Sequence, residues 1–138
     1  MKEITLEAKV ENLSSVLEFV DTELEMNDCS MKTQMQIDVA VEELFVNVAH
    51  YAYTPEIGDV TLIMDVEEGE DGSKKAVITF KDSGMPFDPT AKEDPDVTLS
   101  AQERQIGGLG IYMVKKSMDE MKYIYDEGQN VLTITKTI

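Results

Sequence analysis

Three short segments, in a fixed order along the chain, carry the side chains best suited to chemistry. They are Glu43-Leu-Phe-Val-Asn47, Asp82-Ser-Gly84 and Gly107-Gly-Leu-Gly110. Together they offer an amide oxygen for Mg²⁺, a carboxylate that can accept from an exocyclic amine, and backbone N–H groups for phosphate. A purine nucleoside triphosphate needs these three kinds of group, so the sequence predicts ATP binding.

The first segment lies within a pattern typical of a long helix. Glu43 and Asn47 are four residues apart and therefore share one flank of its apolar stripe. Asn47 is predicted as a Mg²⁺ ligand, and Glu43 as the general base for a hydroxyl that attacks the γ-phosphate. Taken alone, such a pair on a helix rim is more often simply solvated.

The second segment follows an apolar strand. Asp82 is predicted to accept a hydrogen bond from the adenine N6 amine, and Gly84 to let the backbone approach the ring closely. The ordinary alternative is a turn that ends the strand, for which Asp-Ser-Gly is common chemistry.

The third segment precedes a second helical pattern. Gly107, Gly108, Leu109 and Gly110 are predicted to expose N–H groups at the positive end of that helix, where phosphate binds. The pattern is neither a Walker loop nor a dinucleotide fingerprint. Its alternative is a hinge, which a nucleotide lid also needs. Arg104 either reaches the γ-phosphate or lies in solvent, and the sequence favours neither.

The elements that must position these residues follow from periodicity and turn residues. We expect strands at 4–10, 60–66, 75–80, 121–125 and 131–136, and helices at 13–24, 31–52 and 108–118. This order predicts an α+β fold, a two-layer sandwich with a mixed, mostly antiparallel sheet and three main helices on one face.

Two caps and one long loop complete the expected organisation. Asn12 and Ser30 are predicted to cap the first two helices, and Thr54-Pro55 to end the second. Residues 84–106 hold three prolines and little periodicity, and we expect them to form a lid over the nucleotide.

Composition sets the class of protein. The 138 residues, 42% hydrophobic and 29% charged, fit one globular domain over 1–138. Cys29 is the only cysteine, and no apolar run is long enough for a membrane span or a signal peptide, so we expect a cytoplasmic protein. The net charge of −16 disfavours nucleic acid and anionic membranes. Such a surface can attract a basic protein partner, but most of the charge is explained by solubility alone.

With these motifs in order, the chain resembles the GHKL ATPase family (gyrase, Hsp90, histidine kinase, MutL). It is most similar to the stand-alone anti-sigma-factor serine/threonine kinases. The resemblance implies the family's ATP-binding fold, ATP and Mg²⁺ as cofactors, and a homodimer. It implies an anti-sigma-factor antagonist and a sigma factor as partners. It also assigns catalysis to Glu43, Mg²⁺ to Asn47, adenine to Asp82, phosphate to Gly108 and Gly110, and the lid arginine to Arg104.

Two positions depart from the family pattern. Pro86 stands where the second glycine of Asp-x-Gly-x-Gly is usual. Tyr51 stands where a histidine is usual four residues after the asparagine, and His50 lies one place earlier. The resemblance therefore assigns no role to His50.

Three functions stay open at this point. The first is an ATP-dependent protein serine/threonine kinase that phosphorylates an antagonist and sequesters a regulator. The second is a nucleotide-gated module that binds a partner without transferring phosphate. The third is a small acidic interaction protein that binds no nucleotide.

Overall fold

The computed structural model describes residues 1–53, 56–91 and 108–138 of the chain. The strands are β1 (Lys2–Glu7), β2 (Asp59–Glu68), β3 (Lys74–Asp82), β4 (Glu120–Asp126) and β5 (Gln129–Thr137). The α-helices are α1 (Leu13–Met26), α2 (Met31–Asn47) and α3 (Gly108–Ser117). Short turns of other helix types are η1 (Val10–Asn12), η2 (Val48–Ala52) and η3 (Pro89–Ala91).

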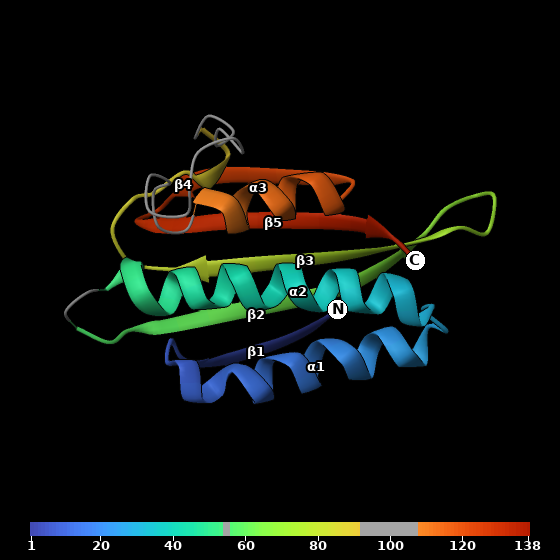
Figure 1. Cartoon of the computed structure of the whole chain (residues 1–138), viewed down its shortest axis with the longest axis horizontal. Helices are drawn as coiled ribbons and strands as arrows, with labels where there is room; N and C mark the ends of the chain where they lie inside the picture. The colour runs from blue at the N-terminus through green and yellow to red at the C-terminus, as the bar shows by residue number, and fades with distance from the viewer. Residues whose placement is uncertain (54–55, 92–107) are drawn as a thin grey trace.

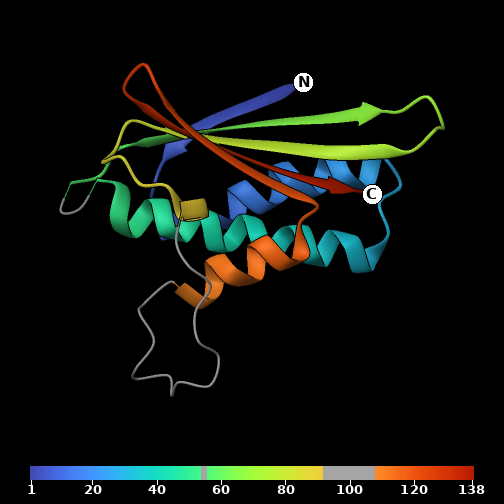
Figure 2. The same cartoon turned by 90° about the horizontal axis from the view of Figure 1, so that it is seen from above.

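The strands form one sheet in the order β1-β2-β3-β5-β4, and each of the four described pairings is antiparallel. All three α-helices cover one face of this sheet (Figures 1 and 2). The predicted α+β two-layer sandwich is therefore confirmed. The register places Asp82, the last residue of β3, directly opposite Asn130 of β5.

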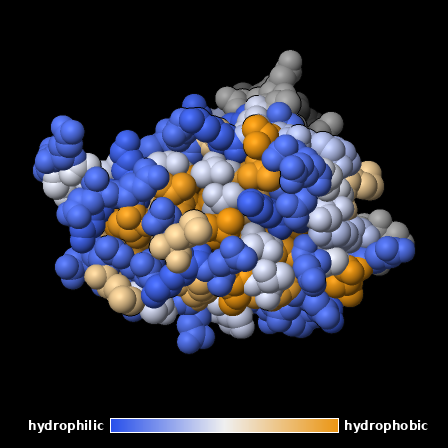
Figure 3. Space-filling view, turned by 180° about the vertical axis from the view of Figure 1, so that it is seen from behind, coloured by the Kyte–Doolittle hydropathy of each residue, from blue (hydrophilic) through white to orange (hydrophobic). Residues whose placement is uncertain are grey.

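The core lies between the helices and the sheet, where the predicted periodicities point. Every second residue of β3 from Ala76 to Asp82 is buried, as expected for a strand with one covered face. The helices bury the residues of their apolar stripes, which are Val16, Val20 and Leu24 of α1 and Ile37, Ala40, Val41, Leu44 and Phe45 of α2. Seen from behind, the molecule shows apolar side chains scattered among polar ones (Figure 3).

Of the two predicted helix caps, one is present and the other is not. The Oγ of Ser30 accepts from the N–H of Thr33 at 3.3 Å, so this predicted cap is confirmed. The Asn12 cap is wrong: its Nδ2 donates to the carbonyl of Glu7 at 2.8 Å instead. Strand β1 already ends at Glu7, and the short turn η1 lies between it and α1. The backbone of Asn12, at φ −90° and ψ 0°, lacks the extended geometry that is typical of a capping residue.

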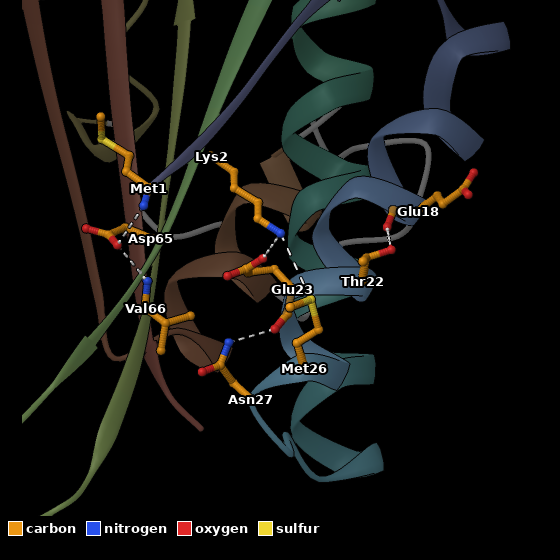
Figure 4. Close-up of polar contacts among 9 residues, drawn as sticks. All are labelled: Met1, Lys2, Glu18, Thr22, Glu23, Met26, Asn27, Asp65 and Val66. Carbon is orange, nitrogen blue, oxygen red and sulfur yellow. Dashed lines mark hydrogen bonds and ion pairs between the residues drawn. The ribbon is translucent and has the colours of Figure 1, made fainter.

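Strand β1 is tied to α1 by polar contacts near the N-terminus (Figure 4). The Nζ of Lys2 lies 2.8 Å from the Oε2 of Glu23 and 4.0 Å from the Sδ of Met26. These contacts help to fix α1 over the edge of the sheet. In the parts of the chain described here, no helix has the length and hydropathy to cross a membrane.

Candidate functional site

The end of α2 is the first feature that shapes the site. Instead of one long α-helix to residue 52, α2 ends at Asn47 and continues as the π-helical turn η2. A π-turn contains an extra residue per turn and so rotates the side chains that follow it. Tyr51 and Ala52, four and five residues after Asn47, line the same cavity as Asn47, as helical spacing places them, whereas His50 lines a separate groove beside residues 7–12.

The cavity has a volume of about 360 Å³, which is within the range of small-molecule sites. Most of its wall is apolar. Its lining comprises Leu44, Asn47, Val48, Tyr51, Ala52, Phe80, Asp82, Met85, Pro86, Phe87, Pro89, Ile111, Tyr123, Asn130 and Leu132. The structure thus brings Asn47 and Asp82, which are 35 residues apart in the sequence, to one cavity that α3 also lines through Ile111.

Asp82 is a buried carboxylate, only 6% exposed, at the end of β3. Its Oδ1 accepts from the backbone N–H of Gly84 and from the Nδ2 of Asn130, both at 2.9 Å. Within the described residues, its Oδ2 has no protein donor. The carboxylate is therefore held through one oxygen and can accept a hydrogen bond from a ligand through the other.

Gly84 lies against the end of η2. A Cβ added there would lie 2.3 Å from the carbonyl oxygen of Ala52, which accepts from the N–H of Met85 at 2.9 Å. Tyr53 supports the same turn, because its hydroxyl accepts from the N–H of Ser83 and donates to the carbonyl of Asp59, both at 2.7 Å. Burial raises the pKa of this phenol, so it stays protonated and keeps its donor.

Asn130 is the functional residue that sequence reasoning missed. Its amide is buried at 6% exposure and bonds to Asp82, Met85, Phe87 and Tyr123. The sequence did carry a signal. In β5, residues 130, 132 and 134 are buried, so Asn130 is a polar residue in an inward series otherwise made of Leu132 and Ile134. Because a buried amide needs hydrogen-bond partners, a polar residue at an inward position of a strand indicates that polar groups surround it.

Glu43 lies beside the cavity and not in its lining. It shares a mostly apolar groove of about 270 Å³, between α2 and α3, with Gly110. A Cβ on Gly110 would come within 1.8 Å of the Oε1 of Glu43, so the glycine allows the carboxylate to lie directly against α3. Asn47 and Glu43 are thus one helical turn apart, facing two adjacent hollows.

The donor set fits a nucleotide and its cation. The Nδ2 of Asn47 is buried and has no hydrogen-bond partner among the described residues. Rotation of the amide group by a half-turn about its Cβ–Cγ bond exchanges Nδ2 and Oδ1. The side chain can therefore either donate to a phosphate or bind a cation through its oxygen. The described residues contain no cluster of three or more His, Cys, Asp or Glu for a metal. A cation here would depend on Asn47 and on the ligand's own oxygens.

Some predicted residues lie outside this description. Arg104, Gly107 and most of the 84–106 segment are not among the described residues. Gly108 begins α3, followed by Leu109. The assignment of these residues to phosphate or to a lid stays a prediction.

Two comparisons with known proteins concern the chain as a whole. A family model described as "Histidine kinase-like ATPase domain" matches residues 6–136. The relatives include proteins named "Serine-protein kinase RsbW" from Bacillus cereus strains G9842 and B4264, each 29% identical over 104 residues. A protein of the same name from Bacillus anthracis is 28% identical over 104 residues. Each alignment covers 72% of this chain and 61% of the relative, so the chain matches less than two thirds of their length.

Proposed function

The chain belongs to the family of histidine kinase-like ATPase domains, and from this we propose that it is an ATP-dependent protein serine/threonine kinase that also sequesters a regulator. One observation carries the proposal: Asn47 and Asp82 line a single, mostly apolar cavity beside the start of α3. An apolar cavity with a few converging polar groups is the usual form of a nucleotide site.

The adenine ring is proposed to lie among the apolar walls with its amine on Asp82. The Oδ1 of Asp82 is held by Gly84 and Asn130, and Oδ2 accepts from the amine. A base with a carbonyl oxygen in place of that amine would place a hydrogen-bond acceptor opposite the carboxylate, which is also an acceptor. Such a pairing leaves the buried carboxylate unsatisfied, which makes the site selective.

The phosphates are proposed to lie between Asn47 and the first turn of α3. The N–H groups that begin at Gly108 point from the positive end of this helix, and anions bind there. Because the chain carries a net charge of −16, these dipoles must offset a general repulsion of the anionic substrate. Mg²⁺ bound with the amide oxygen of Asn47 would supply positive charge to the phosphate oxygens.

Glu43 is proposed to be the general base. Its carboxylate accepts the proton of a serine or threonine hydroxyl as that oxygen bonds to the γ-phosphorus, and the bond to the β–γ bridging oxygen breaks to release ADP. Gly110 keeps the carboxylate against α3, close to the proposed phosphate position. The groove that holds Glu43 is the side from which the hydroxyl would approach.

The partners are proposed from the resemblance and from the names of the relatives. The matched relatives are named serine-protein kinases. We propose an anti-sigma-factor antagonist as the phosphate acceptor, a sigma factor or similar regulator as the sequestered partner, and a homodimer acting in the cytoplasm as a single domain. No nucleic acid or membrane is part of the proposal, in keeping with the acidic charge.

The test is phosphate transfer from ATP to a purified anti-sigma-factor antagonist, measured for the wild type and for Glu43→Gln. We expect Glu43→Gln to lower the transfer rate by about 10²–10⁴-fold, the usual contribution of general base catalysis, and to leave the Kd for ADP unchanged. Glu42→Gln is the matched control, because Glu42 is the adjacent, exposed residue of the same helix. Equal rates for wild type and Glu43→Gln would overturn the role of Glu43.

A second candidate function is a nucleotide-gated binding module that transfers no phosphate. The observation in its favour is that Glu43 lies outside the lining of the main cavity. ATP-dependent binding of the regulator, with no transfer by the wild type to any tested hydroxyl partner, would favour this module over the kinase.

A further inference from the structure

The side chain of Asn130 uses its whole hydrogen-bonding capacity. Its Nδ2 donates to the Oδ1 of Asp82 and to the carbonyl of Met85, each at 2.9 Å. Its Oδ1 accepts from the N–H of Phe87 at 3.1 Å and from the hydroxyl of Tyr123. A primary amide has two donor hydrogens and two lone pairs, so all four are in use. Asn130 therefore cannot form a hydrogen bond to a ligand unless one of these bonds breaks.

The network also determines which way the amide points. A flipped amide would place its NH₂ group against the N–H of Phe87, and its oxygen against the carboxylate of Asp82 and the carbonyl of Met85. An N–H cannot accept, and neither a carboxylate nor a carbonyl can donate. Only one orientation satisfies the four partners. Burial raises the pKa of the Tyr123 phenol, so that hydroxyl stays protonated and can donate.

The loop that follows Asp82 is attached through the same amide. Met85 is bonded through its carbonyl to Asn130 and through its N–H to the carbonyl of Ala52. Phe87 is bonded to Asn130 through its N–H. Pro86 lies between these two residues, where it loses no hydrogen bond because it has no N–H, and its ring restricts φ. The loop is thus held at both sides of the proline.

From these contacts we propose that Asn130 is a positioning residue that orients Asp82 and the 85–87 loop, and so sets the preference for adenine over a base that lacks the exocyclic amine. This inference rests on the proposed function, because it takes the cavity as the nucleotide site. Asn130 donates a hydrogen bond to Oδ1 of Asp82, so Oδ2 is the oxygen left to accept from the exocyclic amine of the base. A side chain without an amide cannot donate to both Asp82 and Met85 and also accept from the N–H of Phe87.

The test compares the Kd values of ADP and inosine diphosphate, which carries a carbonyl oxygen in place of the amine, by calorimetry. We expect the wild type to prefer ADP by about tenfold or more, the value of one hydrogen bond to a charged group. In Asn130→Val, which removes all four bonds, this ratio should fall towards one. Asn130→Thr has one hydroxyl that can still donate to Asp82, so it should keep part of the preference while binding ADP more weakly.

The matched control is Ile134→Ala, on the same face of β5 but outside the cavity lining. It should lower the melting temperature and leave the ratio of the two Kd values unchanged, which separates positioning from general loss of stability. A folded Asn130→Val protein with the wild-type ratio would overturn the inference and leave the proposed function intact. If Asn130→Val does not fold, Asn130→Thr with wild-type Kd values for both nucleotides overturns it. A wild type that binds neither nucleotide overturns both proposals.

Discussion

Replacing Gly84 with alanine tests the closest backbone approach at the site. The new Cβ would lie 2.3 Å from the carbonyl oxygen of Ala52 and 2.7 Å from its carbonyl carbon. Both are backbone atoms, and the oxygen also accepts from the N–H of Met85 at 2.9 Å. The carbonyl cannot move away without straining η2 or losing that hydrogen bond.

The expected cost follows from these two contacts. Overpacking against a fixed neighbour costs about 1–3 kcal/mol, and the lost hydrogen bond adds about 1 kcal/mol. The free energy of unfolding should therefore fall by about 2–4 kcal/mol. For a chain of 138 residues, about 3–4 °C of melting temperature corresponds to 1 kcal/mol, so Gly84→Ala should melt about 6–16 °C below the wild type.

The assay is thermal unfolding by circular dichroism, with Gly72→Ala as the control. Gly72 has no atom within 4 Å of an added Cβ, but its φ is +83°, so the control measures backbone strain alone. That strain costs about 1–2 kcal/mol. A Gly84→Ala protein that melts within about 3 °C of the wild type would refute the close contact with Ala52. The same variant should bind ADP more weakly, because the turn carries Asp82.

Three further changes have distinct expected outcomes. Gly110→Ala should change the melting temperature little, because alanine favours a helix by about 1 kcal/mol while the Glu43 side chain, from its Cγ outward, must rotate away. Phosphate transfer should fall at least about tenfold, and unchanged transfer would contradict the proximity of Glu43 to the reaction. Burial and the neighbouring carboxyl group of Asp21 raise the pKa of Asp38 to about 8. The folded chain therefore keeps a proton that the unfolded chain loses near pH 4, so urea titrations should show the free energy of unfolding falling between about pH 4 and 8. The slope should be below about 1.4 kcal/mol per pH unit because solvent screens this partly exposed pair, and an Asp38→Asn protein with the wild-type slope would contradict the assignment. Tyr53→Phe leaves the N–H of Ser83 without its partner and should lower the free energy of unfolding by about 1–2 kcal/mol in the same titration; no change would mean that water replaces the hydroxyl.

The periodicity and turn residues of the local sequence were sufficient to predict the order of the helices and strands. Helix α2 follows from an apolar stripe with Ser30 at its start, and β2 and β3 follow from alternation around a turn rich in acids and glycine. The spacing of Glu43 and Asn47 placed them on one flank of a helix, because 3.6 residues per turn leaves little choice. The residue types alone also indicated a purine triphosphate as the ligand.

Only the tertiary structure decided which of these residues lie in contact with one another. The α-helical pattern changes to the π-helical turn η2 at Val48, and no periodicity in the sequence predicts such an insertion. The bond between Asn130 and Asp82 joins residues 48 positions apart, and it exists because β5 pairs with β3 in this register. Pairing across a sheet depends on the whole chain, whereas helix and strand preference depends on a few neighbours. The sequence by itself therefore determined which groups are available for the chemistry, and the packing of α2, α3 and β5 decided which of them meet.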